Sequence, residues 1–183
     1  MDDPDPGPSL LSVAASEPAL SRVDVEVVRR DGRWPSDDSS THRLSRVAVA
    51  AFHAGAPRDA RGELGVVLAG DKDVRALNAR WRGKNRPTNV LSFPLEMPQP
   101  GATHGRAAGD VVLAYETVAR EARQKGIPLL DHAAHLIVHG VLHILGYDHE
   151  EDRQAEAMER LESRILTGLG IADPYRADED ART

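Results

Sequence analysis

The stretch HGVLHILGYDH, residues 139–149, has three histidines and a glycine whose spacing predicts a helix followed by a tight turn. On a helix, His139 and His143 are four residues apart, so their imidazoles leave the same face about 6 Å apart along the axis. Gly146 can adopt positive φ and end the helix, which lets the chain turn back and bring His149 close. Three imidazoles in this arrangement could bind one divalent metal and leave a coordination position open, as in catalytic zinc sites.

A histidine on an apolar helix face is often an ordinary core or surface residue, and the chain has 8 histidines. Offsets of 0, 4 and 10 around a helix-ending glycine are harder to explain as coincidence. We therefore expect one zinc ion (Zn²⁺) per chain, bound by His139, His143 and His149. His135 lies one turn earlier on the same face. It could be a fourth ligand, a group that supports a ligand or faces the substrate, or plain helix surface, and the second role is favoured.

The same histidine offsets occur in a zinc protease pattern, H-E-x-x-H-x-x-G-x-x-H, in which the glutamate activates the metal-bound water. In this chain Gly140 takes the place of that glutamate, and glycine cannot accept a proton. No methionine follows at an obvious turn, because Met158 falls inside a later helical pattern. A zinc peptidase therefore stays open only as an alternative that lacks its general base.

Outside this stretch, strand and helix patterns alternate along the chain. Strands are predicted where apolar residues alternate with polar ones or form short runs, and helices where they recur every three to four positions. The expected strands are residues 23–27, 62–70, 89–93 and 110–115, with a loop at 97–109 before the last one. The expected helices are residues 41–54 with Thr41 as the N-cap, 71–81, 115–125, a helix from about Asp131, and 151–169.

This order predicts an α/β fold in which a small sheet of about four strands is covered by about five helices. A chain of 183 residues is long enough to form one hydrophobic core, so we expect a single domain over residues 21–170. The flanking segments, 1–20 and 171–183, are rich in Pro, Asp and small residues, and we expect them to be disordered tails.

The composition favours a protein of a reducing compartment. The chain has no cysteine, which excludes disulfide bridges and thiolate metal sites. No apolar run approaches the roughly 18 residues of a membrane span. The acidic, proline-rich start MDDPDPGP also lacks the positive charge of a signal peptide. We therefore expect a cytoplasmic protein with no membrane partner.

Positive charge is concentrated in one stretch of a chain whose formal net charge is -6. The two expected tails account for this negative charge, which leaves the middle of the chain neutral. No acidic residue lies between Asp73 and Glu96, and the basic residues of this interval are Arg75, Arg80, Arg82, Lys84 and Arg86. Such a stretch could bind phosphates while the indole of Trp81 stacks on a base. The alternative is a solvated helix face with Trp81 in the core beside Val74 and Leu77.

Three blocks of the chain, which together span roughly residues 75 to 150, resemble the motifs of the YbeY family. Residues 139–149 are similar to the family's H-G-x-L-H-L-x-G-Y-D-H. LNARWRGKNRPTNVLSFP, residues 77–94, resembles L-N-x-x-Y-R-x-K-x-x-P-T-D-V-L-S-F-P, and GDVVL, residues 109–113, resembles G-D-I-x-I. The departures are mild, with Trp81 in place of tyrosine and Asn89 in place of aspartate. Asn89 puts in doubt only an acidic role at its position.

The resemblance implies a central mixed sheet surrounded by helices. It also implies a metal-dependent endoribonuclease that acts on single-stranded ribosomal RNA, including maturation of the 3′ end of small-subunit rRNA and ribosome quality control. The implied partners are ribosomal RNA, the small ribosomal subunit and assembly factors. A ribosome assembly factor whose metal serves only the fold stays open as a further alternative.

Cleavage of a phosphodiester bond builds negative charge on the phosphoryl oxygens, and a cation placed there stabilises it. Arg82 matches the functional arginine of the family, and its planar guanidinium can bind two phosphate oxygens at once. We expect Arg82 and His139 to act in catalysis. The residues expected to bind substrate are Arg80, Lys84, Arg86 and His135. Arg82 has an alternative role as a helix-end arginine that fastens the following loop.

Overall fold

A computed structural model of the chain describes residues 22–96, 106–149 and 151–176. Four strands are described: β1 (Arg22–Arg29), β2 (Arg61–Ala69), β3 (Val90–Glu96) and β4 (Arg106–Ala114). Five helices are described: α1 (Asp38–Gly55), α2 (Asp71–Arg82), α3 (Tyr115–Lys125), α4 (Leu129–Ile144) and α5 (Asp152–Gly168). The predicted α/β fold is confirmed.

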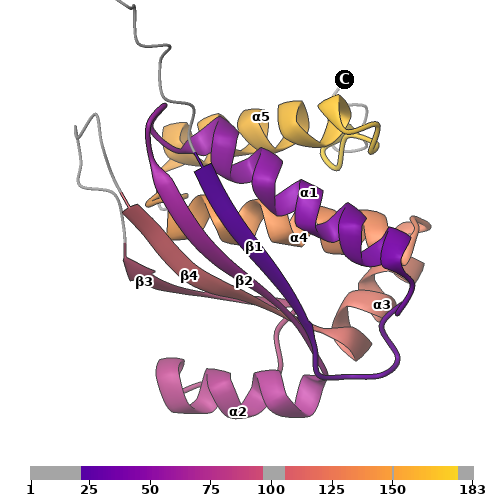
Figure 1. Cartoon of the computed structure of the whole chain (residues 1–183). Helices are drawn as coiled ribbons and strands as arrows, with labels where there is room; N and C mark the ends of the chain where they lie inside the picture. The colour runs from indigo at the N-terminus through magenta and orange to yellow at the C-terminus, as the bar shows by residue number, and fades with distance from the viewer. Residues whose placement is uncertain (1–21, 97–105, 150, 177–183) are drawn as a thin grey trace, which may run out of the picture.

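The strands form one mixed sheet in the order β1-β2-β4-β3. β1 pairs with β2 and β2 with β4 in parallel, whereas β3 runs antiparallel to β4 at the edge of the sheet. Figure 1 shows α1, α4 and α5 stacked over one face of the sheet and α2 alone against the other. The central mixed sheet that the family resemblance implied is therefore present.

Helix α4 lies between the sheet and the outer helices, and its apolar residues belong to the main hydrophobic core. Gly140 lets α4 approach the sheet closely, because a Cβ atom there would lie 2.7 Å from Cγ1 of Val111 and 2.9 Å from Oγ of Ser92. A smaller core on the other face includes Val74 of α2 and Leu91 of β3. The sequence of α4 is apolar on nearly all sides because protein surrounds it.

Some predicted boundaries were wrong. Helix α1 begins at Asp38, and its N-cap is Asp37 rather than Thr41, because the Asp37 carboxylate accepts a hydrogen bond from the Ser40 amide at 2.8 Å. Strand β4 begins at Arg106, inside the predicted loop, because its pairing with β2 extends to the start of that strand. Gly109, which counted toward the Pro/Gly-rich loop, is tolerated in a strand that is buried between layers.

The chain continues to pack after α5. Ile171 is buried, and Tyr175 hydrogen-bonds to Glu162 of α5. The sequence assigned residues 171–176 to a disordered tail, whereas the structure places them against the domain. The remaining residues of both predicted tails lie outside the described residues. Within the described ranges no single helix has the length and hydrophobicity of a membrane span, although α3 and α4 reach both as a pair bent by 114°.

Candidate metal centre and basic turn

His139, His143 and His149, which we call the histidine cluster, come together as the sequence predicted. One nitrogen from each ring lies within 4.8 Å of the other two. The two α4 histidines face each other, with 3.0 Å between their Nε2 atoms. The ring of His149 lies 5.6 Å from that of His139 and 5.0 Å from that of His143, centroid to centroid.

The turn after α4 brings His149 back to the helix. Gly146 has a φ of 88°, a left-handed conformation that glycine adopts at low cost. The Tyr147 amide donates to the carbonyl of Leu142 at 3.0 Å, which closes the end of the helix as in a Schellman motif. The Tyr147 hydroxyl donates to the carbonyl of Gly55 in α1, so this turn is fastened to another helix. The predicted helix-ending role of Gly146 is confirmed.

Hydrogen bonds fix the orientation of both helical imidazoles. Nδ1 of His143 lies 3.0 Å from the carbonyl oxygen of Tyr147, which can only accept, so this nitrogen carries the proton. Nδ1 of His139 donates to Oε1 of Glu162 at 2.9 Å. In its neutral form, each ring therefore presents the lone pair of Nε2 to the centre of the cluster. Carboxylate and carbonyl partners of this kind support metal-binding histidines in many proteins.

Glu162 is the residue that sequence reasoning missed. It is 1% exposed and accepts hydrogen bonds from His135, His139 and the Tyr175 hydroxyl. Burial alone would raise the pKa of Glu162, but these hydrogen bonds outweigh burial and lower its pKa to about 2. Its position on the apolar face of α5, between Met158 and Ile165, was the available signal. A charged residue on such a face needs partners, and the histidines are those partners.

His135 lies with this carboxylate rather than in the histidine cluster. Its Nε2 is 3.1 Å from Oε2 of Glu162 and 3.2 Å from the Tyr175 hydroxyl. The surface of its side chain is 15% exposed. His135 therefore contacts the carboxylate that also accepts from His139, and its roles in supporting a ligand or facing the substrate stay predictions.

The donor set suits a divalent metal. In a tetrahedral zinc site with Zn–N bonds of about 2.0 Å, two nitrogens lie roughly 3.3 Å apart, close to the 3.0 Å between the two Nε2 atoms. Burial lowers the pKa of His143, and repulsion from His139 and His149 lowers it further. The neutral imidazole that a metal requires is therefore favoured. His149 is the most exposed of the three, so this side of the cluster faces solvent.

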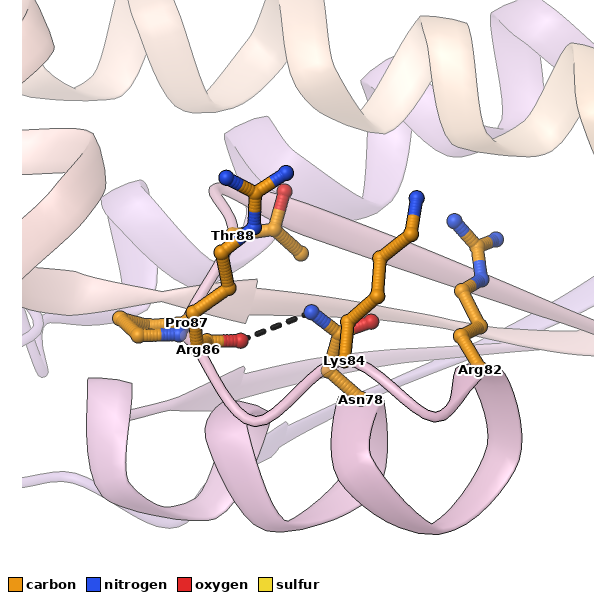
Figure 2. Close-up of a pocket in the computed structure, with 6 residues that line it drawn as sticks. All are labelled: Asn78, Arg82, Lys84, Arg86, Pro87 and Thr88. Atoms are coloured by element: carbon orange, nitrogen blue, oxygen red, sulfur yellow. Dashed lines mark hydrogen bonds between the residues drawn. The ribbon is translucent and has the colours of Figure 1, made fainter.

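Basic side chains line a pocket of about 180 Å³ where α2 ends, formed by Asn78, Arg82, Lys84, Arg86, Pro87 and Thr88. We call Arg82, Lys84 and Arg86 the basic turn. Figure 2 shows that their side chains extend from the backbone toward the same side. The pocket keeps its shape because the buried Asn78 donates its amide to the carbonyl of Arg86 at 2.7 Å, and because Gly83 adopts a φ of 66°.

The cations of the basic turn are not neutralised within the described part of the chain. All three side chains are exposed, and none forms an ion pair with a described residue. Because these cations are exposed and unpaired within this part of the chain, the pocket can hold an anion.

Strand β3 begins at Val90, shortly after this turn, and packs against α4, the helix that carries two of the cluster histidines.

Trp81 is not a core residue, although the sequence placed it on one face with Val74 and Leu77. It is 63% exposed, and α2 ends one residue later, at Arg82. The guanidinium carbon of Arg80 lies 5.3 Å from the centroid of its ring. The alternative that placed Trp81 in the core is therefore wrong. Arg80 is exposed, and its role in binding substrate stays a prediction.

Asn89, where the family motif has aspartate, belongs to a separate network. Its Nδ2 donates to Oε2 of Glu121 at 3.1 Å, and the same oxygen lies 2.7 Å from Nε2 of the buried His132. An aspartate here would bring two carboxylates together. The asparagine therefore suits Glu121, and the expectation that position 89 has no acidic role agrees with this geometry.

The family model described as "Endoribonuclease YbeY" matches residues 33–170. A curated protein of that name from Parvibaculum lavamentivorans is 50% identical, over 87% of this chain and 89% of its own length. One from Sinorhizobium fredii is 43% identical, over 85% and 94%. A solution structure of TM1509 from Thermotoga maritima is 20% identical, with a TM-score of 0.49 over 82% of this chain and 98% of that one.

Proposed function

The chain belongs to the YbeY endoribonuclease family and is a nuclease of the hydrolase class, and from this premise we propose that it cleaves single-stranded RNA by a metal-dependent mechanism. The histidine cluster is the observation that carries the proposal. Its two Nε2 lone pairs converge, and hydrogen bonds at both Nδ1 atoms fix their direction. Hydrophobic packing alone would not require two Nε2 atoms to be aimed at one point, whereas metal binding does.

His139, His143 and His149 would hold one zinc ion. Zinc bound in this way supplies a Lewis acid and lowers the pKa of its water to about 7. The chain's own contribution is to keep the helical imidazoles aligned, and burial favours the neutral form of His143. Glu162 and the Tyr147 carbonyl hold the Nδ1 protons of His139 and His143.

The basic turn would hold the RNA backbone. Arg82 can bind two oxygens of the scissile phosphate through its planar guanidinium and stabilise the charge that develops on them. Lys84 and Arg86 line the same pocket and would hold neighbouring phosphates, with Arg80 beside them. These cations are exposed and have no ion-pair partner among the described residues, which supports the assignment.

The proposed substrate is single-stranded ribosomal RNA, including the 3′ end of small-subunit rRNA, and the proposed setting is ribosome maturation and quality control in the cytoplasm. The small ribosomal subunit and its assembly factors are the proposed partners. The three family-like sequence blocks and the family match support this part of the proposal.

A peptidase function is disfavoured by the position of Gly140. This residue is buried and faces Val111 and Ser92 of the sheet, rather than the cluster. A glutamate introduced there would have no room at its Cβ and would not reach the metal-bound water. We expect no cleavage of casein by the wild-type protein or by Gly140→Glu. Casein cleavage that a chelator and His139→Ala both abolish would contradict this expectation.

The test is an RNA cleavage assay with the purified protein. We expect cleavage of single-stranded rRNA fragments, little cleavage of the same sequences in duplex form, loss of activity with a chelator, and recovery when zinc is restored. His143→Ala should be inactive, and His53→Ala, an exposed histidine of α1, is the matched control. RNA that is bound but left intact under all conditions would instead favour an assembly factor with a structural metal.

A further inference from the structure

Trp81 is a large hydrophobic side chain that the fold leaves on the surface. It is 63% exposed, and Leu95 is the other large exposed hydrophobic residue among those described. An exposed indole forgoes the stabilisation that burial would give, and exposed apolar groups that gather in one place often mark a binding surface. The function proposed above, which uses a metal site and a phosphate pocket, assigns no role to this ring.

The ring is held in place although it is exposed. Phe93 of β3 contacts it in an edge arrangement, with 6.4 Å between the ring centroids and 65° between the planes. Arg80 lies on it from the neighbouring position. Phe93 itself packs against the smaller core. A ring that its neighbours already orient loses little conformational entropy when a ligand binds.

The surroundings of Trp81 are positively charged. Arg80 and Arg82 flank it in the sequence, and Arg82 begins the basic turn that lines the pocket in Figure 2. Within the described residues, neither arginine side chain forms an ion pair. A partner that suits both features brings a flat apolar surface and negative charge together. Each nucleotide of a single strand offers both, as a base and a phosphate.

We infer that Trp81 is a stacking site for a nucleobase of single-stranded RNA, placed so that the phosphates beside that base contact the basic turn. The inference rests on the proposed function and extends it from the phosphate backbone to the bases. Duplex RNA keeps its bases stacked inside the helix, so this site accepts a single strand and rejects a duplex. Any base has a flat face, so the site discriminates strandedness rather than sequence.

The test compares two short probes of equal length and charge: 2′-O-methyl-oligouridylate and the corresponding abasic ribose-phosphate strand. Trp81→Ala should weaken binding of the oligouridylate about tenfold and leave binding of the abasic strand unchanged. Trp81→Phe should retain most of the affinity, because phenylalanine keeps an aromatic face. Leu95→Ala is the control, since it removes exposed apolar surface without removing an aromatic ring, and it should bind both probes as the wild type does.

Fluorescence gives an independent signal. The chain has 2 tryptophans, and Trp34 is 1% exposed, so quenching by the oligouridylate should come from Trp81 and disappear in Trp81→Phe. Equal affinities of wild type and Trp81→Ala for the oligouridylate would overturn the inference. So would equal weakening toward both probes, which would mean that the ring only supports the basic turn. A wild-type protein that discriminates between the probes but cleaves no RNA would support the stacking site and contradict the proposed nuclease function.

Discussion

The histidine cluster and the basic turn are built in opposite ways. In the cluster, the helical imidazoles are fixed through their Nδ1 atoms by the Glu162 carboxylate of α5 and by the Tyr147 carbonyl of the adjoining turn, and Glu162 is buried. In the basic turn, the backbone is held by Asn78, but the charged ends of the side chains are exposed and unpaired within the described residues. The side chains of the histidine cluster are therefore held in place before a ligand binds. In the basic turn the backbone is held, but the charged side chains can change their conformation.

The difference has a physical reason. A small metal ion requires ligand atoms placed to within a few tenths of an ångström, and partners behind the ligands supply that accuracy. A flexible polyanion is bound through charges that act over several ångströms, and exposed arginine and lysine side chains can follow it. Substitutions in the cluster should therefore act on metal binding, and substitutions in the basic turn on RNA alone.

The largest effect is expected from His143→Ala, which removes a ligand from the centre of the cluster. We expect the metal content to fall from about one equivalent to background, because two imidazoles cannot replace three. Elemental analysis of the purified protein measures it, with His53→Ala as the control. Equal metal content in wild type and His143→Ala would show that the cluster is not the metal site.

Arg82→Ala should lower RNA cleavage on the order of 100-fold, the scale of losing one donor to the transition state. The variant should keep its metal and lose about 1 kcal/mol or less of stability, as for a surface substitution. Arg82→Lys should recover activity only in part, because an ammonium group cannot make the two-pronged contact.

Lys72→Ala, an exposed cation at the start of the same helix, is the control for Arg82. It is preferable to Arg75→Ala, because Arg75 donates to the Asn85 side chain and so helps to hold the turn. A Tm far below that of the wild type, or cleavage at the wild-type rate, would show that Arg82 only fastens the loop.

Glu162→Gln tests whether the buried carboxylate tunes the cluster. Replacing the partner of a metal-binding histidine costs about 10–100-fold in metal affinity, so we expect a loss of that size in competition with a chromophoric chelator. Glu159→Gln, on the exposed face of the same helix, should bind metal as the wild type does. If both variants bind metal equally well, Glu162 serves packing rather than the metal site.

Gly140→Ala tests the close approach of α4 to the sheet. The added Cβ would lie 2.7 Å from Val111, so the helix must shift or the sheet must yield. We expect a loss of about 1–3 kcal/mol in the free energy of unfolding, measured by chemical denaturation. Gly168→Ala is the control, since a Cβ there meets nothing within 4 Å. Unchanged stability of Gly140→Ala would mean that α4 can shift on the sheet to accommodate the added methyl group at no cost.

The smallest effect is a pH dependence of the metal-free protein. Burial lowers the pKa of His132, despite the opposing hydrogen bond to Glu121, so its contribution to stability is present above about pH 6.5 and is lost as the pH falls below it. Glu162 has its pKa lowered to about 2 from 4.5, so its contribution is present above pH 4.5 and is lost as the pH falls toward 2.

Denaturation of chelator-treated protein across this range should therefore show two separate losses of stability. His132→Gln should flatten the upper one, and Glu162→Gln the lower one. A single loss that neither substitution alters would refute the assignment of these two groups.

The sequence by itself determined the order of strands and helices, the three-histidine cluster and the glycine that ends α4. These features depend on neighbours within about ten residues, and helix periodicity together with the conformational freedom of glycine relates them to geometry directly. The basic turn was also visible, because its charges follow one another along the chain.

Only the tertiary structure decided which side chains lie behind the cluster and which face solvent. Glu162 and Tyr175 reach the histidines from other parts of the chain, and no local pattern links them. Trp81 shares a helix face with the buried Val74, yet it is 63% exposed although it contacts Phe93 of β3. Contacts between distant segments depend on how helices and strands pack, and periodicity within one helix specifies a face without specifying what covers it.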